Sequence, residues 1–282
     1  MKPSAGAPSL RLSALSRNDK SGRHDAIQFD DGAAYERFMG CWSRAAGALF
    51  LEWLAPPVEA RWLEIGCGTG AFTQLVSGRC RPAAIVAFDP APEQIAYARR
   101  HLRKTEAAFH VASAEAMPFT GSCFEVVASA LVNFMRNRDA GVREMRRVSC
   151  AGGTIAGYVW DFAAKRMPNG PLVRAMHRLG IDVPSPPGAD VCSLEALRAL
   201  FARADLSAIE ATVVEIDVSF PDFTAFWAAQ TPRFSPITRQ IERLNEPQRS
   251  RLEAALRSEL PIQRDGRITY PARAYAVKTR VP

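Results

Sequence analysis

Long hydrophobic runs are missing from this sequence. No apolar stretch approaches the roughly 20 residues that a helix needs to cross a bilayer, which argues against a transmembrane segment. Apolar residues nevertheless make up 48% of the 282 residues, which is ample for a buried core. We therefore expect a soluble globular protein.

Paired cysteines are also missing. The six cysteines stand at positions 41, 67, 80, 123, 150 and 192, without a Cys-x-x-Cys pair and without histidines at metal-binding spacing. This pattern favours neither a disulfide framework nor a zinc site, so we expect no bound metal. Free thiols fit a reducing compartment, and the expected location is cytoplasmic.

Acidic residues are scarce over residues 1–25, which are rich in Ser, Arg, Ala and Pro. This composition predicts a disordered leader, although an organelle transit peptide has a similar composition; a secretory signal is not supported. The leader carries part of the formal charge of +7, and the other basic residues are scattered along the chain. The charge therefore does not favour nucleic acid as a partner.

The most informative stretch runs from Arg61 to Gly70, with the sequence RWLEIGCGTG. A short apolar run ends abruptly at glycine, and the apolar residues that follow recur at helical spacing. Gly66, Gly68 and Gly70 have no Cβ, so the backbone can turn sharply against a ligand while the next helix directs its positive end toward it. This stretch predicts a strand, a glycine turn and a helix that hold a nucleotide-like cofactor.

The glycine spacing alone does not decide between cofactors. Gly66-x-Gly68-x-x-Ala71 also fits the dinucleotide pattern of nicotinamide and flavin enzymes, with Asp89 at about the distance of a ribose-binding acid. The fuller string over residues 63–70, LEIGCGTG, is more specific. It resembles the first motif of the class I S-adenosylmethionine (SAM) dependent methyltransferases, where an acidic residue, here Glu64, stands two before the first glycine.

The resemblance covers about residues 35–282 and, through Gly152-Gly153 and the apolar strand after it, is notably to the menaquinone and ubiquinone biosynthesis (UbiE/COQ5-like) type. Alternating strands and helices by themselves predict a doubly wound α/β sheet. The resemblance implies a Rossmann-like, seven-stranded, mostly parallel sheet with helices on both faces and the last strand inserted antiparallel. We expect one methyltransferase domain over 26–282, with an N-terminal helical cap and helical insertions at about 161–190 and 220–262.

The apolar patterns place the individual elements. The expected strands cover residues 62–65, 83–88, 107–112, 154–160, 213–218 and 272–278, and residues 124–134 are expected to form a further strand that runs into a short turn. The expected helices cover residues 35–54, 71–76, 93–102, 139–148 and 193–204, the last with Ser193 as its N-cap.

The resemblance also implies which residues contact SAM. Asp89, at the carboxyl end of a buried strand, can accept hydrogen bonds from both ribose hydroxyls, with capping of the next helix as the alternative. The segment from Ser113 to Glu115 resembles the adenine-holding segment, with serine in place of the usual aspartate. Leu131 would border the methionine end. The expected cofactor contacts are Tyr35, Arg44, Glu64, Gly66, Cys67, Gly68, Gly70, Asp89, Pro90, Ser113, Ala114, Glu115 and Leu131.

The methyl acceptor is less defined by the sequence. Asn133 is not followed by the Pro-Pro-aromatic signature of enzymes that methylate nucleic-acid amines. Asp161 and His177 are candidate bases, with a solvated turn and a surface helix as the alternatives. Aromatic residues over 220–234 favour a lid and a small hydrophobic or planar acceptor. The other hypotheses are a catalytically silent SAM-binding module and a nicotinamide oxidoreductase, and we also consider a homodimer.

Overall fold

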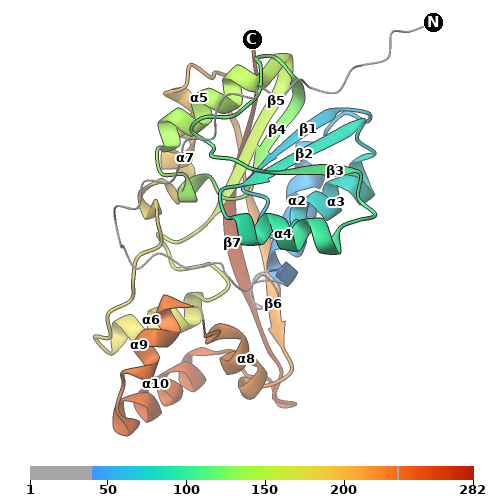
Figure 1. Cartoon of the computed structure of the whole chain (residues 1–282). Coiled ribbons are helices and arrows are strands. Elements are labelled where there is room, and N and C mark those ends of the chain that lie inside the picture. The colour runs from blue at the N-terminus through green and yellow to red at the C-terminus, as the bar shows by residue number, and fades with distance from the viewer. Residues whose placement is uncertain (1–39, 234) are drawn as a thin grey trace, which may run out of the picture.

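A computed structural model describes residues 40–233 and 235–282, so the expected leader and Tyr35 lie outside the described residues. Strands and helices alternate along the described chain (Figure 1). The strands are β1 (Arg61–Ile65), β2 (Ala84–Asp89), β3 (Ala107–Val111), β4 (Phe124–Ser129), β5 (Ser149–Trp160), β6 (Glu210–Phe220) and β7 (Ile268–Arg280). The helices are α2 (Cys41–Leu54), α3 (Ala71–Cys80), α4 (Pro92–His101), α5 (Arg138–Val148), α6 (Gly170–Arg178), α7 (Leu194–Ala202), α8 (Phe223–Gln230), α9 (Pro236–Glu242) and α10 (Glu246–Glu259), with short 3-10 turns η2 (Val132–Phe134) and η3 (Ala189–Val191).

The strands of the described chain form one seven-stranded sheet in the order β3-β2-β1-β4-β5-β7-β6. Strands β1 to β5 pair in parallel, whereas β7 lies antiparallel between β5 and β6. This arrangement confirms the expected doubly wound, mostly parallel sheet with its last strand inserted antiparallel. None of the described helices is long and apolar enough to span a bilayer.

Alternate side chains of each strand face opposite layers of helices, because successive residues of a strand point to opposite sides of a sheet. Trp62 of β1 packs in a cluster with residues of α2 and α3, while Leu63 packs in a second cluster with residues of α5 and α7. Ala87 of β2 contacts α4 on the first face. Each fully buried large side chain contributes roughly 1.5–3 kcal/mol, so the two layers fix the register of the sheet.

The fifth strand begins earlier than the expected residue 154. The strand already begins at Ser149, and Gly152 and Gly153 lie inside it. Gly152 has a φ of 73°, and the pairing of β4 with β5 shifts register between Phe124 and Val126. The glycines therefore accommodate an irregularity within the strand, which is a position where glycine has a conformational advantage.

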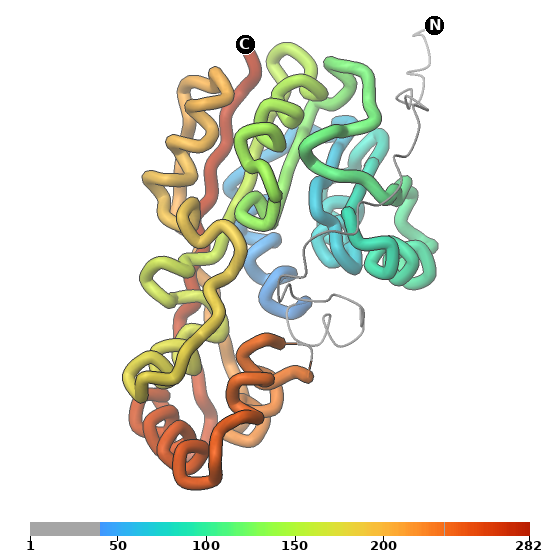
Figure 2. Tube along the Cα trace, turned by 60° about the vertical axis from the view of Figure 1, so that its left-hand side comes forward, coloured from blue at the N-terminus to red at the C-terminus, as the bar shows by residue number. Residues whose placement is uncertain are grey.

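Strands β6 and β7 continue beyond the carboxyl end of β5. Pairing of β5 with β7 stops at Trp160 with Ala274, whereas β6 pairs with β7 as far as Phe220 with Ile268. The overhanging ribbon reaches helices α6, α8, α9 and α10, which we call the distal helices (Figures 1 and 2). Residues 161–190 contribute α6, and residues 220–262 contribute the other three.

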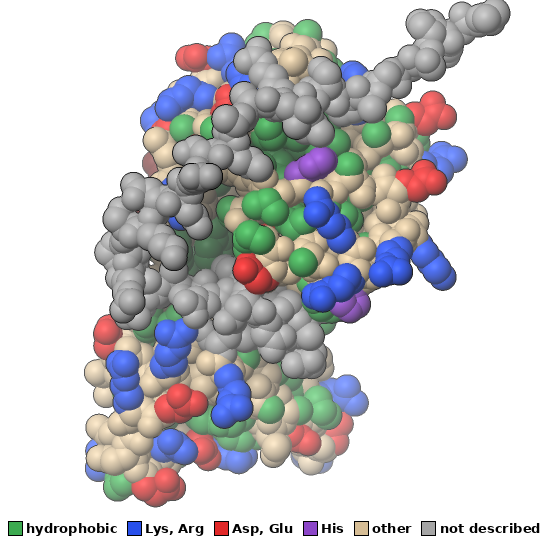
Figure 3. Space-filling model, in the orientation of Figure 1, with side chains coloured by type: hydrophobic (Ala, Val, Ile, Leu, Met, Phe, Trp, Pro, Cys, Tyr) green, Lys and Arg blue, Asp and Glu red, His purple; other side chains and the backbone are tan. Residues whose placement is uncertain are grey.

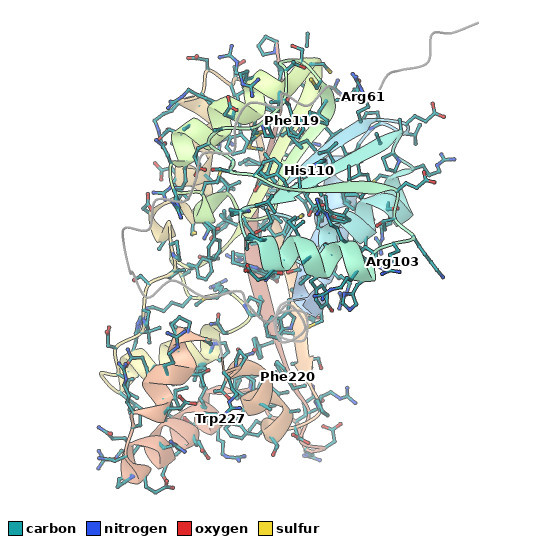
Figure 4. All side chains as sticks on the ribbon, in the orientation of Figure 1. Arg61, Arg103, His110, Phe119, Phe220 and Trp227 are labelled. Carbon is teal, nitrogen blue, oxygen red and sulfur yellow. The ribbon has the colours of Figure 1, made fainter. Side chains whose placement is uncertain are left out.

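The distal helices share an aromatic core with the ribbon. Phe220 and Phe226 are buried and meet edge to face, with their ring centroids 5.3 Å apart, and Tyr270 of β7 packs against both. Trp227 is half-buried and stacks on Phe223. Figure 4 shows Trp227 among the distal helices. These rings are used in packing, so the expectation that residues 220–234 form an acceptor-facing lid is wrong for the buried members; Phe234 lies outside the described residues.

We predict that Phe226→Ala destabilises the protein by about 3–5 kcal/mol, because it removes a fully buried aromatic ring from this core. Urea unfolding followed by circular dichroism measures the loss. Val213→Ala provides the matched control, because Val213 is an exposed residue of β6. Equal unfolding midpoints for the two variants would contradict the assignment of Phe226 to a packed core.

Candidate active site

The glycine turn between β1 and α3 is hydrogen-bonded to the end of β2. The backbone N–H groups of Gly66 and Cys67 both donate to the carbonyl oxygen of Phe88, at 2.8 and 3.0 Å. Gly66, Gly68 and Gly70 have φ values of 73°, 53° and 87°, a region that residues with a Cβ rarely adopt. Glycine at these positions therefore lets the chain pass at once from strand to helix.

The three glycines have different surroundings. A Cβ on Gly70 would overlap the side chain of Leu102, so Gly70 allows α3 to begin against the end of α4. A Cβ on Gly66 would lie 3.7 Å from the Cβ of Leu131, which is ordinary contact. A Cβ on Gly68 would meet no atom within 4 Å. Gly68 therefore borders open space in which a ligand can approach the backbone closely.

The carboxylate of Asp89 connects the glycine turn to the start of α4. Its Oδ2 accepts a hydrogen bond from the Gly68 N–H at 3.0 Å, and its Oδ1 accepts one from the Ala91 N–H at 2.9 Å. Burial raises the pKa of Asp89, while these two hydrogen bonds act in the opposite direction. Because a carboxylate oxygen has two lone pairs, each oxygen can still accept a second hydrogen bond from a ribose hydroxyl. The ribose-binding and turn-capping interpretations are thus compatible.

A second acid, Glu64, lies under the turn. Only 2% of Glu64 is exposed, and its Oε2 accepts a hydrogen bond from the Thr73 hydroxyl at 2.6 Å. Burial raises the pKa of Glu64 to about 8, and the negative charge of Asp89 adds to this rise. No pattern in the sequence indicates the Thr73 partner, which stands nine residues away on α3. A cation bound nearby would favour the ionised form of Glu64.

These residues fit SAM. Gly68 leaves room for the ligand, Asp89 retains lone pairs for hydroxyl groups, and the two acids favour a positively charged ligand such as the sulfonium. The site lies at the carboxyl ends of β1 and β2, where doubly wound sheets bind nucleotide-like ligands. Among the described residues, no group of His, Cys, Asp and Glu could hold a metal ion.

Comparison with known proteins points to the same chemistry. A family model described as a methyltransferase domain matches residues 63–153. A putative methyltransferase structure from Bacillus halodurans has a TM-score of 0.56, with 15% identity, over 84% of this chain and 98% of that chain. The matched residues form a methyltransferase domain, and the described chain has the class I methyltransferase fold. A structure of phosphoethanolamine N-methyltransferase 2 from Haemonchus contortus with S-adenosylhomocysteine (SAH) has a TM-score of 0.53, at 15% identity, over 90% of this chain and 58% of that one.

Curated relatives match between 48% and 71% of this chain. A malonyl-[acyl-carrier protein] O-methyltransferase of Geobacter sulfurreducens is 29% identical over 71% of this chain and 74% of its own length. The bifunctional biotin biosynthesis protein BioCD of Bordetella avium is 31% identical over 48% of this chain and 30% of its own length. An uncharacterized methyltransferase of Mycobacterium tuberculosis is 31% identical over 48% of this chain. The chain spans 51% of that protein, about half its length.

The expected adenine segment is hydrogen-bonded to the start of α5. The hydroxyl of Ser113 donates to the Glu115 carboxylate, whose Oε1 also accepts from the backbone N–H of Asn137 at 3.1 Å. Burial acts to raise the pKa of Glu115, but these hydrogen bonds outweigh it and lower the pKa overall. Ala114, the middle residue of the segment, is buried. Glu115 therefore links the segment to the start of α5.

The other expected contacts occupy varied positions. Cys67 packs its side chain against Ile95 and Ala98 of α4, and burial raises the pKa of its thiol well above the usual range, so the turn uses only its backbone. Pro90 is exposed beside Asp89. Leu131 is half-buried beside the glycine turn, and Arg44 is half-buried in the first turn of α2.

The two candidate bases do not lie as expected. Asp161 is fully buried; its Oδ2 accepts from the Tyr275 hydroxyl at 2.9 Å and its Oδ1 from the Ala164 N–H at 2.9 Å. It orders the turn that follows β5 and does not face an open acceptor site. His177 is exposed in the last turn of α6. The structure therefore gives Asp161 a structural role and supports the surface-helix interpretation of His177.

We predict that Gly68→Val abolishes SAH binding, because the branched side chain would fill the open space beside the turn. Isothermal titration calorimetry measures this loss. Gly68→Ala would place a residue with a Cβ at the same positive φ, which costs roughly 1–2 kcal/mol of strain. Its side chain is smaller than that of valine, so this variant distinguishes the effect of backbone strain from that of steric blockage. Gly78→Val is the control, because a Cβ there also meets open space but lies on α3 away from the turn. Unchanged SAH affinity in Gly68→Val would remove this site.

We predict that Glu64→Gln flattens the dependence of stability on pH. In the native protein the pKa of Glu64 is about 8 against an ordinary value of 4.5, so the unfolded chain releases this proton first as pH rises. The free energy of unfolding should fall between about pH 4.5 and 8, by at most about 1.4 kcal/mol per pH unit from this group. Urea unfolding across that range tests this, with the exposed Glu52→Gln as control. Equal slopes in wild type and Glu64→Gln would contradict the prediction.

Proposed function

We propose that this protein is a methyltransferase that transfers the methyl group of SAM to a small acceptor with an apolar or planar body and a nucleophilic atom that is already deprotonated. The observation that carries the proposal is that the Asp161 carboxylate is buried and engaged in hydrogen bonds. Within the described chain, the turn after β5 at residues 160–164 carries this carboxylate alone, and both of its oxygens accept hydrogen bonds. An acceptor that loses its proton without help needs no base there.

Methyl transfer from SAM requires little acid-base catalysis by the protein. SAM supplies a methyl group on a sulfonium sulfur, which leaves as a neutral thioether. The chain has to align the acceptor with the methyl carbon and exclude water. Gly68 and Asp89 would hold the ribose and methionine parts, and Leu131 would border the methyl group. Phe134, in η2 after β4, and Phe162, two residues after β5, are half-buried and support an apolar surface for the acceptor.

A carboxylate is the favoured acceptor group. It is ionised at neutral pH and therefore reacts without a base, and several relatives are named as O-methyltransferases of malonyl-[acyl-carrier protein]. Lys and Arg side chains are interspersed with acidic ones over the distal helices in Figure 3, which supports a small molecule over nucleic acid. Membership of the menaquinone and ubiquinone biosynthesis type and a homodimer stay predictions.

We predict that SAH and SAM raise the melting temperature and that NAD does not, because only a ligand of the native state stabilises it. The protein is then incubated with SAM and a panel of small carboxylic acids, amines and phenols, and SAH formation is measured by mass spectrometry. We expect SAH formation with carboxylates that have an apolar body. Cofactor binding without turnover of any acceptor would favour the catalytically silent module, and a shift with NAD alone would favour the oxidoreductase.

A further inference from the structure

A loop from the far side of α6 returns to the carboxyl end of β4. We call its residues 187–190 the strap. The side-chain Nδ2 of Asn133, in η2, donates a hydrogen bond to the carbonyl oxygen of Pro187 at 3.0 Å. Only 1% of Asn133 is exposed, so this is a buried side-chain donor held by a loop 54 residues away in the sequence. A buried donor that loses its partner is costly, which makes the contact a specific anchor.

The strap is closely fitted at this anchor. Gly188 has a φ of 63°, and a Cβ there would overlap the backbone oxygen of Asn133. The guanidinium of Arg138 then donates to both carboxylate oxygens of Asp190, at 3.0 and 2.9 Å. This pair is partly exposed, so it contributes less than the buried contact. Three successive features thus hold the strap against the end of β4 and the start of α5.

The anchor lies next to the site of methyl transfer. Asn133 follows Leu131 by two residues, and Leu131 lies beside the Gly66 backbone. At the start of α5, Asn137 donates its N–H to Glu115 of the adenine segment, while the next residue, Arg138, pairs with the strap. One short stretch of chain, residues 131–138, therefore contacts the glycine turn, the adenine segment and the strap.

We propose that Asn133 is a positioning residue for the methyl acceptor. By holding the strap against the end of β4, it sets one wall of the acceptor site at the methyl end of the cofactor. The inference rests on the proposed methyl transfer to a small molecule. The acceptor contacts the strap and not Asn133 itself, so loss of the anchor should weaken acceptor binding and leave the SAM site intact.

Two variants break the anchor from opposite sides. Asn133→Asp keeps the volume but places an oxygen opposite the Pro187 carbonyl, and Gly188→Ala adds a Cβ that overlaps Asn133. Ser185→Ala, in the exposed part of the same loop, is the matched control. With the carboxylate that gives most SAH, we expect the acceptor KM to rise at least tenfold in both variants, with kcat changed less and the SAH Kd within twofold of wild type. The control should match wild type.

Hydrogen exchange gives a readout that does not require turnover. The amides of Val191 and Cys192 donate to Gly188 and Ala189, at 3.1 and 3.2 Å, and should exchange faster in both variants while α2 stays unchanged. An unchanged acceptor KM in both variants, or a parallel loss of SAH affinity, would overturn the role of Asn133. Wild-type protein that binds SAH but methylates no acceptor would instead overturn the proposed function itself, whatever the exchange rates show.

Discussion

The hydrogen bond from the Gly68 N–H to the Asp89 carboxylate is the interaction on which the cofactor site depends. It joins the carboxyl ends of β1 and β2, and it requires a backbone conformation at residue 68 that favours glycine. The same carboxylate caps the turn into α4 through Ala91. A single buried side chain thus connects the starts of α3 and α4.

The cofactor half of the fold was predictable because its signals are local. Glycines at 66, 68 and 70 must turn the chain, and alternate apolar residues of β1 and β2 must face opposite layers. The overhang of β6 and β7 was not predictable in this way. Its length depends on pairing between residues about 50 positions apart, such as Phe220 with Ile268. No local pattern in the sequence marks where β5 stops pairing with β7.

The residues on the acceptor side were even harder to predict from the sequence, because their contacts are long-range. Asp161 stands at the end of a strand, where a catalytic acid is often expected. Its carboxylate instead accepts a hydrogen bond from the hydroxyl of Tyr275, which lies 114 residues away in the sequence on β7. The anchor between Asn133 and Pro187 also depends on a long-range contact. Its only local trace is the Pro-Pro-Gly turn at 186–188, which indicates a turn but not what the turn contacts.

The distal helices are joined to the sheet by continuous pairing, which limits how the acceptor site can open. Strands β6 and β7 pair from Glu210 with Lys278 to Phe220 with Ile268 without interruption, and the chain leaving β5 also bonds to β7, through Asp161 and Arg166 with Arg273. Rotation of the distal helices about a hinge would break or bend this ladder, and no glycine interrupts either strand. The strap depends on one buried hydrogen bond and a partly exposed ion pair. Since local opening follows the weaker contacts, acceptor entry should move the strap before it moves the distal helices.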